Sequence, residues 1–406
     1  MTELLMTHRI PASTTPLGEW LAEVADRVTL ITSPEAYQDY RDVFPRVYAV
    51  PDYSDNTAVE ALLTEACASR PVASLIHVTE DDVLRCARVR DTFGIRGLRY
   101  AEAITWRDKH LMKRLVRGKV PVPEFTVPAG ADAAARFAAA VGYPVVVKPR
   151  TSFGSHGVTL AADDRQLAAL AARWDPGDVL LEAFVPGGML HIDGFTADGE
   201  CLFAQPSRYV NGCLSFHEGQ PLGSVQLDPG SDDFTRAVAF AREVLAAMPP
   251  VGFCPFHLEA FQRPDGELVF CEIACRLGGA HIMESLTYAT GVNPAALWIR
   301  HQAGLADGPS VASALTAGSR RFGWLLIPPR PGRLAGVRQP EGFDFIEDFI
   351  VKVPLPSVFT GATGSTDSFI AFVVSGPDSV GLEANIRKCA DLADDLAIWE
   401  EIHAGV

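Results

Sequence analysis

Basic side chains are scarce in this sequence. Its 406 residues contain 35 lysines and arginines against 50 aspartates and glutamates, which gives a formal net charge of -15. Binding to nucleic acids or to anionic membranes needs a basic surface, so the charge balance speaks against both kinds of partner. Any phosphate-binding pocket must then be basic locally, against the charge of the whole chain.

Several other patterns are absent. The eight cysteines show no CxxC and no Cys/His spacing of a zinc site, and we expect reduced thiols in a cytoplasmic protein. The N-terminal residues lack the apolar run of a signal peptide, and no stretch approaches the roughly 20 apolar residues of a membrane span. No Gly-x-Gly-x-x-Gly follows a strand, so dinucleotide binding has no support.

The length allows about two to four domains. In the first hundred residues strands alternate with helices, which is typical of a parallel α/β layer. The strands are expected at 27–33 and 72–79, and the helices at 59–69 and 81–94. A charged helical stretch follows at 101–118.

Patterns of both α/β and α+β type occupy the rest of the chain. The expected strands are 144–150, 158–162, 178–188, 348–356 and 368–376, with a β-hairpin at 253–276. The expected helices are 133–142, 163–174, 231–248, 281–303 and 382–397.

The most informative residues lie in the hairpin. Its apolar arms flank Asp265-Gly266, a strong hairpin signal. A two-residue loop there, or a symmetric four-residue loop, places Glu259 opposite Glu272; a bulge would break this register. Opposed carboxylates repel each other, so they need solvent or a cation. Two hard oxygen ligands fit magnesium shared with a nucleotide phosphate. The alternative is a solvated edge whose acids oppose aggregation.

Other residues extend this hypothesis. Arg276 shares a face with Glu272 and could hold a second anion, or it could pair with a nearby acid. Gly278 and Gly279 precede a helix, where backbone N–H groups can approach an anion. Lys148, in an apolar strand, needs a partner, either a phosphate or a carboxylate. Lys109 is a surface lysine by default.

Two further segments offer polar groups. The loop 151–157 has glycines and hydroxyls that suit an anion, although many polar turns look alike. The strand that ends near Val185 could pair its backbone with an adenine edge, and Glu182 could meet the exocyclic amine. Arg208 could meet a substrate carboxylate or lie at the surface.

Together these motifs resemble the ATP-grasp superfamily, most clearly over 101–305. The order is Lys109, VVVKP, SFGSHG, EAFVPG, FHLEAF and CEIACR. Within that superfamily the chain looks like the carboxylate–amine ligases that make dipeptides and related amides, the L-amino acid ligases. The resemblance implies an ATP-grasp fold with an N-terminal Rossmann-like α/β domain and a small C-terminal domain. We expect boundaries at 1–100, 101–185 (the small lobe, or lid), 186–310 (the large lobe) and 311–406.

The resemblance also implies roles for individual residues. ATP would contact Lys109, Lys148, Ser152, Gly154, Ser155, Gly157, Glu182, Phe184, Val185 and, near the ribose, His191. Glu259 and Glu272 would bind Mg²⁺ or Mn²⁺. Arg276 would stabilise the acyl phosphate, and the substrates would lie near Arg208, Arg276, Gly278 and Gly279.

One position departs from the family pattern. Many members carry an asparagine metal ligand two residues after the second glutamate, where this chain has Ala274. A second magnesium would then have fewer protein ligands, or another residue would substitute. The expected partners are a small carboxylic acid and an amine. A homodimer is common in the family.

Overall fold

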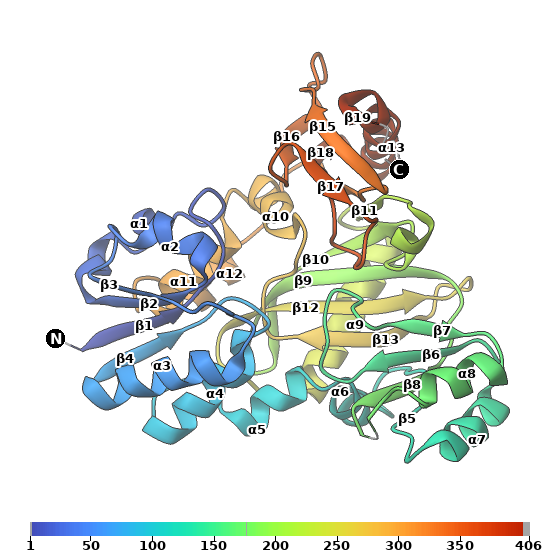
Figure 1. Ribbon diagram of the computed structural model, residues 1–406, viewed down its shortest axis with the longest axis horizontal. Coiled ribbons are helices and arrows are strands. Elements are labelled where there is room, and N and C mark those ends of the chain that lie inside the picture. The colour runs from blue at the N-terminus through green and yellow to red at the C-terminus, as the bar shows by residue number, and fades with distance from the viewer. Residues whose placement is uncertain (1, 176, 401–406) are drawn as a thin grey trace, which may run out of the picture.

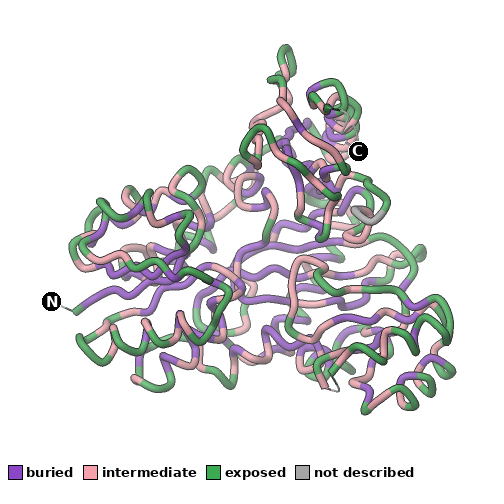
Figure 2. The backbone as a smooth tube through the Cα atoms, in the orientation of Figure 1, coloured by how far each residue is buried: buried purple, intermediate pink, exposed green. Residues whose placement is uncertain are grey.

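The computed structural model describes residues 2–175 and 177–400, except for the side chains of residues 216 and 217. The described residues form four sheets. The largest has eight strands and lies at the centre of the molecule, and the other three lie around it (Figure 1). Buried residues concentrate in the strands, and the outer sides of the helices are exposed (Figure 2). No described helix has both the length and the apolar character to cross a membrane.

The N-terminal sheet is parallel, with the order β3-β2-β1-β4. Its strands are β1 Glu3–Thr7, β2 Val28–Thr32, β3 Arg46–Ala49 and β4 Val72–Ile76. The helices of this segment are α1 Leu17–Trp20, η1 Ala22–Arg27, α2 Pro34–Tyr40, α3 Asn56–Ser69 and α4 Asp82–Phe93. The predicted parallel α/β layer is confirmed, and β1 was missed. Both faces of the two central strands are buried, which explains their apolar runs.

The charged stretch after this sheet is not one helix. It divides into α5 Tyr100–Ala103, η2 Ile104–Trp106 and α6 Lys109–Val116. Asp108 starts α6 because its carboxylate accepts from the backbone N–H groups of His110 and Leu111. The small lobe follows with an antiparallel sheet of order β5-β8-β6-β7. Its elements are β5 Phe125–Thr126, α7 Ala131–Val141, β6 Val145–Pro149, β7 Thr159–Ala161, α8 Asp164–Ala171 and β8 Val179–Ala183.

The large sheet is antiparallel, with the order β13-β12-β9-β10-β11-β14-β18-β16. Its strands are β9 Gly188–Ala197, β10 Glu200–Val210, β11 Leu222–Gln226, β12 Cys254–Gln262, β13 Leu268–Ala274, β14 Arg321–Ile327, β16 Ile346–Val351 and β18 Ile370–Gly376. A three-stranded sheet contains β15 Gly332–Val337, β17 Ser357–Phe359 and β19 Ala397–Glu400. The expected boundary at 310 therefore crosses one continuous sheet.

The helices of this half are η3 Ser215–Glu218, α9 Asp232–Ala247, α10 Ile282–Thr290, α11 Pro294–Gln302, α12 Gly308–Ser313 and α13 Ser379–Leu396. The single helix expected at 281–303 was wrong. Gly291, at a φ of 74°, ends α10, and Asn293 caps α11 with Pro294 in its first turn. The break lets α10 pack on the large sheet while α11 packs against the N-terminal core.

Candidate active site

The hairpin β12–β13 brings the two predicted metal ligands together. Glu259 lies directly opposite Glu272 in the register of the two strands, as expected. One oxygen of each carboxylate and the Cys271 sulfur lie within 4.8 Å of one another. Their positions on one patch of the hairpin confirm the predicted pairing of the two acids.

The route to this register differs from the expected one. The turn is a three-residue loop in which the Arg263 N–H donates to Glu267 O at 2.9 Å. Near the turn, Gln262 therefore faces Leu268, one position out of the predicted register. A bulge at Cys271 shifts the register back before Glu259 is reached. Two irregularities that the sequence did not reveal thus cancel.

The two carboxylates have few protein partners. Lys109 Nζ lies 3.2 Å from Glu272 Oε2. The Tyr209 hydroxyl donates to Glu259 at 2.8 Å, and His257 Nε2 lies 3.7 Å from the same carboxylate. Burial would raise the pKa of Glu272, but the nearby Lys109 and Lys148 ammonium groups lower it below its usual range. Both acids keep lone pairs for a further cation.

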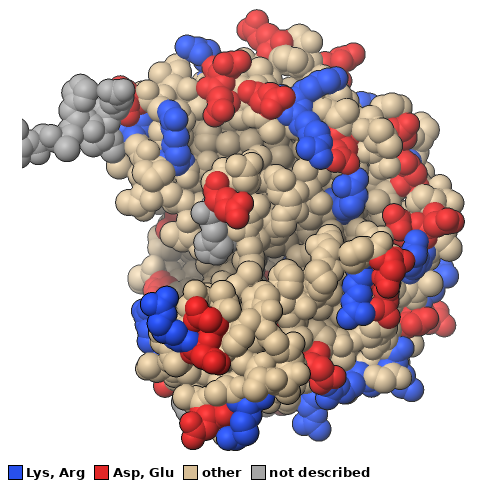
Figure 3. Space-filling model, turned by 90° about the vertical axis from the view of Figure 1, so that its right-hand side faces the viewer, with Lys and Arg blue, Asp and Glu red and all other residues tan. Residues whose placement is uncertain are grey.

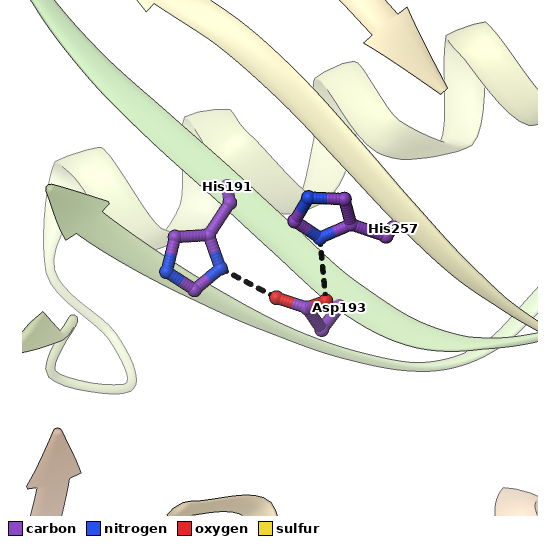
Figure 4. Close-up of side chains that lie close together, drawn as sticks. All are labelled: His191, Asp193 and His257. Atoms are coloured by element: carbon purple, nitrogen blue, oxygen red, sulfur yellow. Dashed lines mark hydrogen bonds and ion pairs between the residues drawn. The ribbon is translucent and has the colours of Figure 1, made fainter. Parts of the chain in front are cut away.

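His191, Asp193 and His257 form a buried network of hydrogen bonds on the neighbouring strands β9 and β12 (Figure 4). Asp193, on β9, accepts from His191 at 2.5 Å and, through its other oxygen, pairs with His257 at 2.8 Å. Burial would lower the pKa of His257, but Asp193 raises it to about 9. The second ring nitrogen of His191 lies 2.6 Å from Ser224 Oγ. Since both ring nitrogens of His191 have protein partners, this geometry does not support its predicted contact with a ribose.

A second charged cluster lies between α6 and the small lobe. Glu182 Oε1 is 2.9 Å from Lys148 Nζ and 3.1 Å from Lys113 Nζ, and all three residues are buried. Burial would lower the pKa of Lys148, but Glu182 raises it above its usual range. For Lys113 burial dominates and lowers the pKa. Of the two partners predicted for Lys148, a phosphate or a carboxylate, the structure shows a carboxylate. The predicted contact of Glu182 with adenine stays a prediction.

Lys109 is not at the surface. Its side chain is 5% exposed at the start of α6, and Nζ donates to the carbonyl of Ser152 as well as meeting Glu272. The default expectation was therefore wrong. Lys109 joins the loop 151–157 to the second carboxylate, which is compatible with the phosphate contact that the resemblance implied.

The glycine loop needs its glycines. Gly154 and Gly157 have φ values of 62° and 75°, where a side chain would be strained, and Ser155 also has a positive φ of 60°. Ser365, in the loop before β18, donates to Gly154 O at 3.2 Å. The strand end beyond β8 presents an exposed Phe184 and a buried Val185. The predicted contacts of these residues and of Ser152 with ATP stay predictions.

The predicted substrate residues do not all come together. Arg276 forms an ion pair with Glu80, the alternative left open for it. Gly278 packs against Asp193 and His257 in the floor of the site, where a Cβ would clash, and Gly279 is exposed. Arg208 pairs with Glu383 of α13 at 2.6 Å. Because strand residues alternate, Arg208 faces away from its neighbour Tyr209, so its predicted role at the substrate is not supported.

Several site residues were missed. Lys113 lies four residues after Lys109, and that helical spacing could have revealed it. Asp193, Tyr209, His257 and Glu80 carried no comparable signal, because their partners are distant in the sequence.

The donor set fits magnesium better than zinc. Burial raises the pKa of the Cys271 thiol to about 12, so a metal ion would have to displace its proton, whereas the two carboxylates are the harder ligands. These carboxylates suit Mg²⁺ completed by water and phosphate oxygens. Ala274 lies opposite His257 and offers no further ligand.

Parts of the sequence are similar to known ATP-binding proteins and ligases. Residues 108–178 match the family described as carbamoyl-phosphate synthase L chain, ATP binding domain. An L-arginine-specific L-amino acid ligase of Bacillus subtilis is 27% identical over 247 residues, or 58% of this chain and 59% of that protein. The chain thus matches less than two thirds of the length of that curated relative.

Solved structures extend the likeness to the whole fold. The L-amino acid ligase from Bacillus licheniformis superposes with a TM-score of 0.74 at 16% identity, over 98% of this chain and 99% of that one. Carboxyaminoimidazole ribonucleotide synthase from Aspergillus clavatus, solved with ATP, gives 0.68 at 16% identity, over 97% and 99%. The chain therefore has the ATP-grasp fold, and part of its sequence resembles an L-amino acid ligase.

Proposed function

We propose that the protein is an ATP-dependent carboxylate–amine ligase that forms an amide bond through an acyl phosphate and releases ADP and phosphate. The observation that carries this proposal is the facing pair Glu259 and Glu272, with Lys109 at 3.2 Å from the second carboxylate. Two acids and a buried lysine at the junction of two lobes suit a magnesium-bound triphosphate.

In this proposal the chain's own residues prepare phosphoryl transfer. Glu259 and Glu272 would hold magnesium, which neutralises phosphate charge when bound. Lys109 and Lys148 would face the phosphates, and the loop 151–157 would cover them with its backbone N–H groups. The substrate carboxylate oxygen attacks the γ-phosphorus, the bond to the β-phosphate oxygen breaks, and ADP leaves.

The second step forms the amide. The amine nitrogen attacks the acyl carbon, the carbon–oxygen bond to phosphate breaks, and phosphate leaves with its electron pair while the amine loses a proton. Arg276 would stabilise the negative charge that develops. Water must be excluded to prevent hydrolysis of the acyl phosphate, and the small lobe would serve as the lid.

Amino acids are the proposed substrates. The relative from Bacillus subtilis is specific for L-arginine, and the structural likeness to another L-amino acid ligase covers nearly the whole chain. We therefore propose one amino acid as the acid and a second amino acid or amine as the acceptor, with L-arginine as the first acid to assay.

The test is ADP release with magnesium across a panel of amino-acid pairs, with mass spectrometry of the products. We expect amide formation that needs both partners. ADP release that does not depend on the amine, or no ADP release with any pair, would contradict the proposal. Dependence on bicarbonate would indicate a carboxylase, and tight ATP binding without turnover would indicate a non-catalytic nucleotide-binding protein.

A further inference from the structure

One buried carboxylate joins two arginines next to the proposed site. Glu80 forms ion pairs with Arg107 through Oε1 and with Arg276 through Oε2. Glu80 is 7% exposed and Arg107 is 8% exposed. Burial would raise the pKa of Glu80, but the two guanidinium groups lower it, so the carboxylate is held in its charged form.

These residues come from separate parts of the fold. Glu80 lies between β4 and α4 of the N-terminal segment, Arg107 precedes α6, and Arg276 follows β13. Arg107 also donates from Nη2 to Thr151 O at 2.7 Å, at the start of the glycine loop. Glu80 therefore links the N-terminal segment to the glycine loop through Arg107 and to the β12–β13 hairpin through Arg276.

The contacts of Arg276 fix its orientation. Nε meets Glu80, and Nη1 donates to Leu277 O at 2.7 Å. Among the described residues Nη2 has no acceptor. A guanidinium held at two of its three nitrogens is planar and rigid, so the direction of Nη2 is set by Glu80 and by the chain itself.

We propose that Glu80 is a positioning residue: it holds Arg276 so that Nη2 faces the anionic group of the reacting substrate. The inference rests on the function proposed above, because it gives Arg276 an anion to bind. Outer partners that orient a functional side chain change activity by about 10–100-fold when removed. Glu80 would act through Arg276 and not on the substrate itself.

The chain offers a matched control. Glu3, on β1, is 8% exposed and also joins two arginines, Arg46 at 2.8 Å and Arg70 at 2.6 Å. Neither arginine belongs to the proposed site. Glu3→Gln therefore removes the same charge from a carboxylate that also joins two arginines, although these arginines are more exposed, and it measures the effect of breaking such a bridge away from the proposed site.

The experiment compares Glu80→Gln with Glu3→Gln in the full chain. For Glu80→Gln we expect kcat for ADP release to fall by about 10–100-fold, with MgADP affinity changed by no more than about twofold. Calorimetry of inorganic phosphate binding to the protein–MgADP complex should show a weaker affinity, by about tenfold or more. Glu3→Gln should change neither quantity by more than about twofold.

Arg276→Gln supplies the second comparison. If Glu80 acts through Arg276, the double variant Glu80→Gln/Arg276→Gln should be no worse than Arg276→Gln alone, because the two residues act as a unit. Glu80→Asp keeps the charge and should recover part of kcat. It also serves as the second variant if Glu80→Gln fails to fold.

Three results would overturn the inference: equal losses in both glutamine variants, unchanged or tighter phosphate binding in Glu80→Gln, or additive effects with Arg276→Gln. The phosphate measurement needs no turnover. If the wild-type protein forms no amide, the proposed function fails, and the role of Glu80 is still decided by phosphate affinity.

Discussion

The fully buried Asp82 of the N-terminal segment and the partly exposed Glu259 and Glu272 of the hairpin differ in how many hydrogen bonds the protein donates to them. Asp82, which is fully buried, accepts from the Tyr53 and Thr79 hydroxyls at 3.1 and 2.6 Å and from Arg85 at 2.8 Å. In the hairpin, Glu272 is met by Lys109 at 3.2 Å and by no other donor among the described side chains. Within the described part of the chain, Glu259 accepts one hydrogen bond, from the Tyr209 hydroxyl, and His257 Nε2 lies farther away at 3.7 Å.

The difference distinguishes carboxylates that the protein itself satisfies from carboxylates that could still bind a ligand. A carboxylate whose lone pairs are filled by the protein contributes to stability and has nothing left to offer a ligand. A pair of facing carboxylates with few donors keeps capacity for a cation. The basic residues near Glu272 keep it ionised, whereas on the surface of Figure 3 acidic and basic side chains are interspersed with no extended basic area.

The largest effect should come from the hairpin. Glu272→Gln removes a proposed metal ligand, and we expect magnesium-dependent ADP release to fall by about 10²–10³-fold. The free energy of unfolding without metal should fall by about 1 kcal/mol, because Lys109 loses its charged partner while the repulsion between the two acids is relieved. Kinetics and chemical denaturation measure the two quantities. A large loss of stability with retained activity would reverse the comparison.

The opposite pattern is expected for the N-terminal segment. Arg85→Met leaves the Asp82 carboxylate buried without its cation, and it should lower the free energy of unfolding by about 3–5 kcal/mol. Activity per folded molecule should change by no more than about twofold. Urea unfolding and active-site titration test this, and a drop in kcat at unchanged stability would contradict it.

Lys113 should combine both kinds of effect. Its Nζ donates to the carbonyls of Phe270 and Cys271, at 3.2 and 2.8 Å, where the bulge resets the register of Glu272. Lys113→Met should cost about 2–4 kcal/mol of stability and also weaken magnesium binding. The exposed Lys119→Met is the control and should stay within about 0.5 kcal/mol. Normal metal affinity in Lys113→Met would show that the bulge does not depend on this lysine.

The smallest effect concerns pH. Burial lowers the pKa of His8 to about 4, and burial with the charge of Arg90 lowers that of His77 to about 3. The unfolded chain binds these protons near pH 6.5, so stability is full above that pH and is lost as the pH falls towards the folded pKa values. At pH 5.5 each histidine should contribute about 1.4 kcal/mol of loss. Thermal unfolding between pH 7.5 and 5.5 should show a smaller decrease for His77→Gln than for the wild type.

Local patterns predicted much of the fold. The hairpin was indicated by its turn residues, and the N-terminal layer by the alternation of apolar strands and helices. The helix bounds and the strand register were wrongly predicted where a capping residue or a distant packing partner determines them. Asp108 begins α6 within the stretch 101–118, which was predicted to be continuously helical. Gly291 ends α10 within the stretch 281–303, which was predicted to be one helix. The bulge at Cys271 leaves no mark in the sequence, and the side chain that donates to its carbonyl, Lys113, lies more than 150 residues away.

The sequence by itself determined which chemistry the chain carries: two acids on facing strands, a lysine in an apolar strand and a glycine loop, in the order of the ATP-grasp ligases. The tertiary structure decided which of these groups keep lone pairs or N–H donors that a ligand could use. That choice depends on contacts between segments far apart in the chain, such as Glu80 with Arg276 and Lys109 with Glu272, and burial makes such contacts strong only after the segments have packed together.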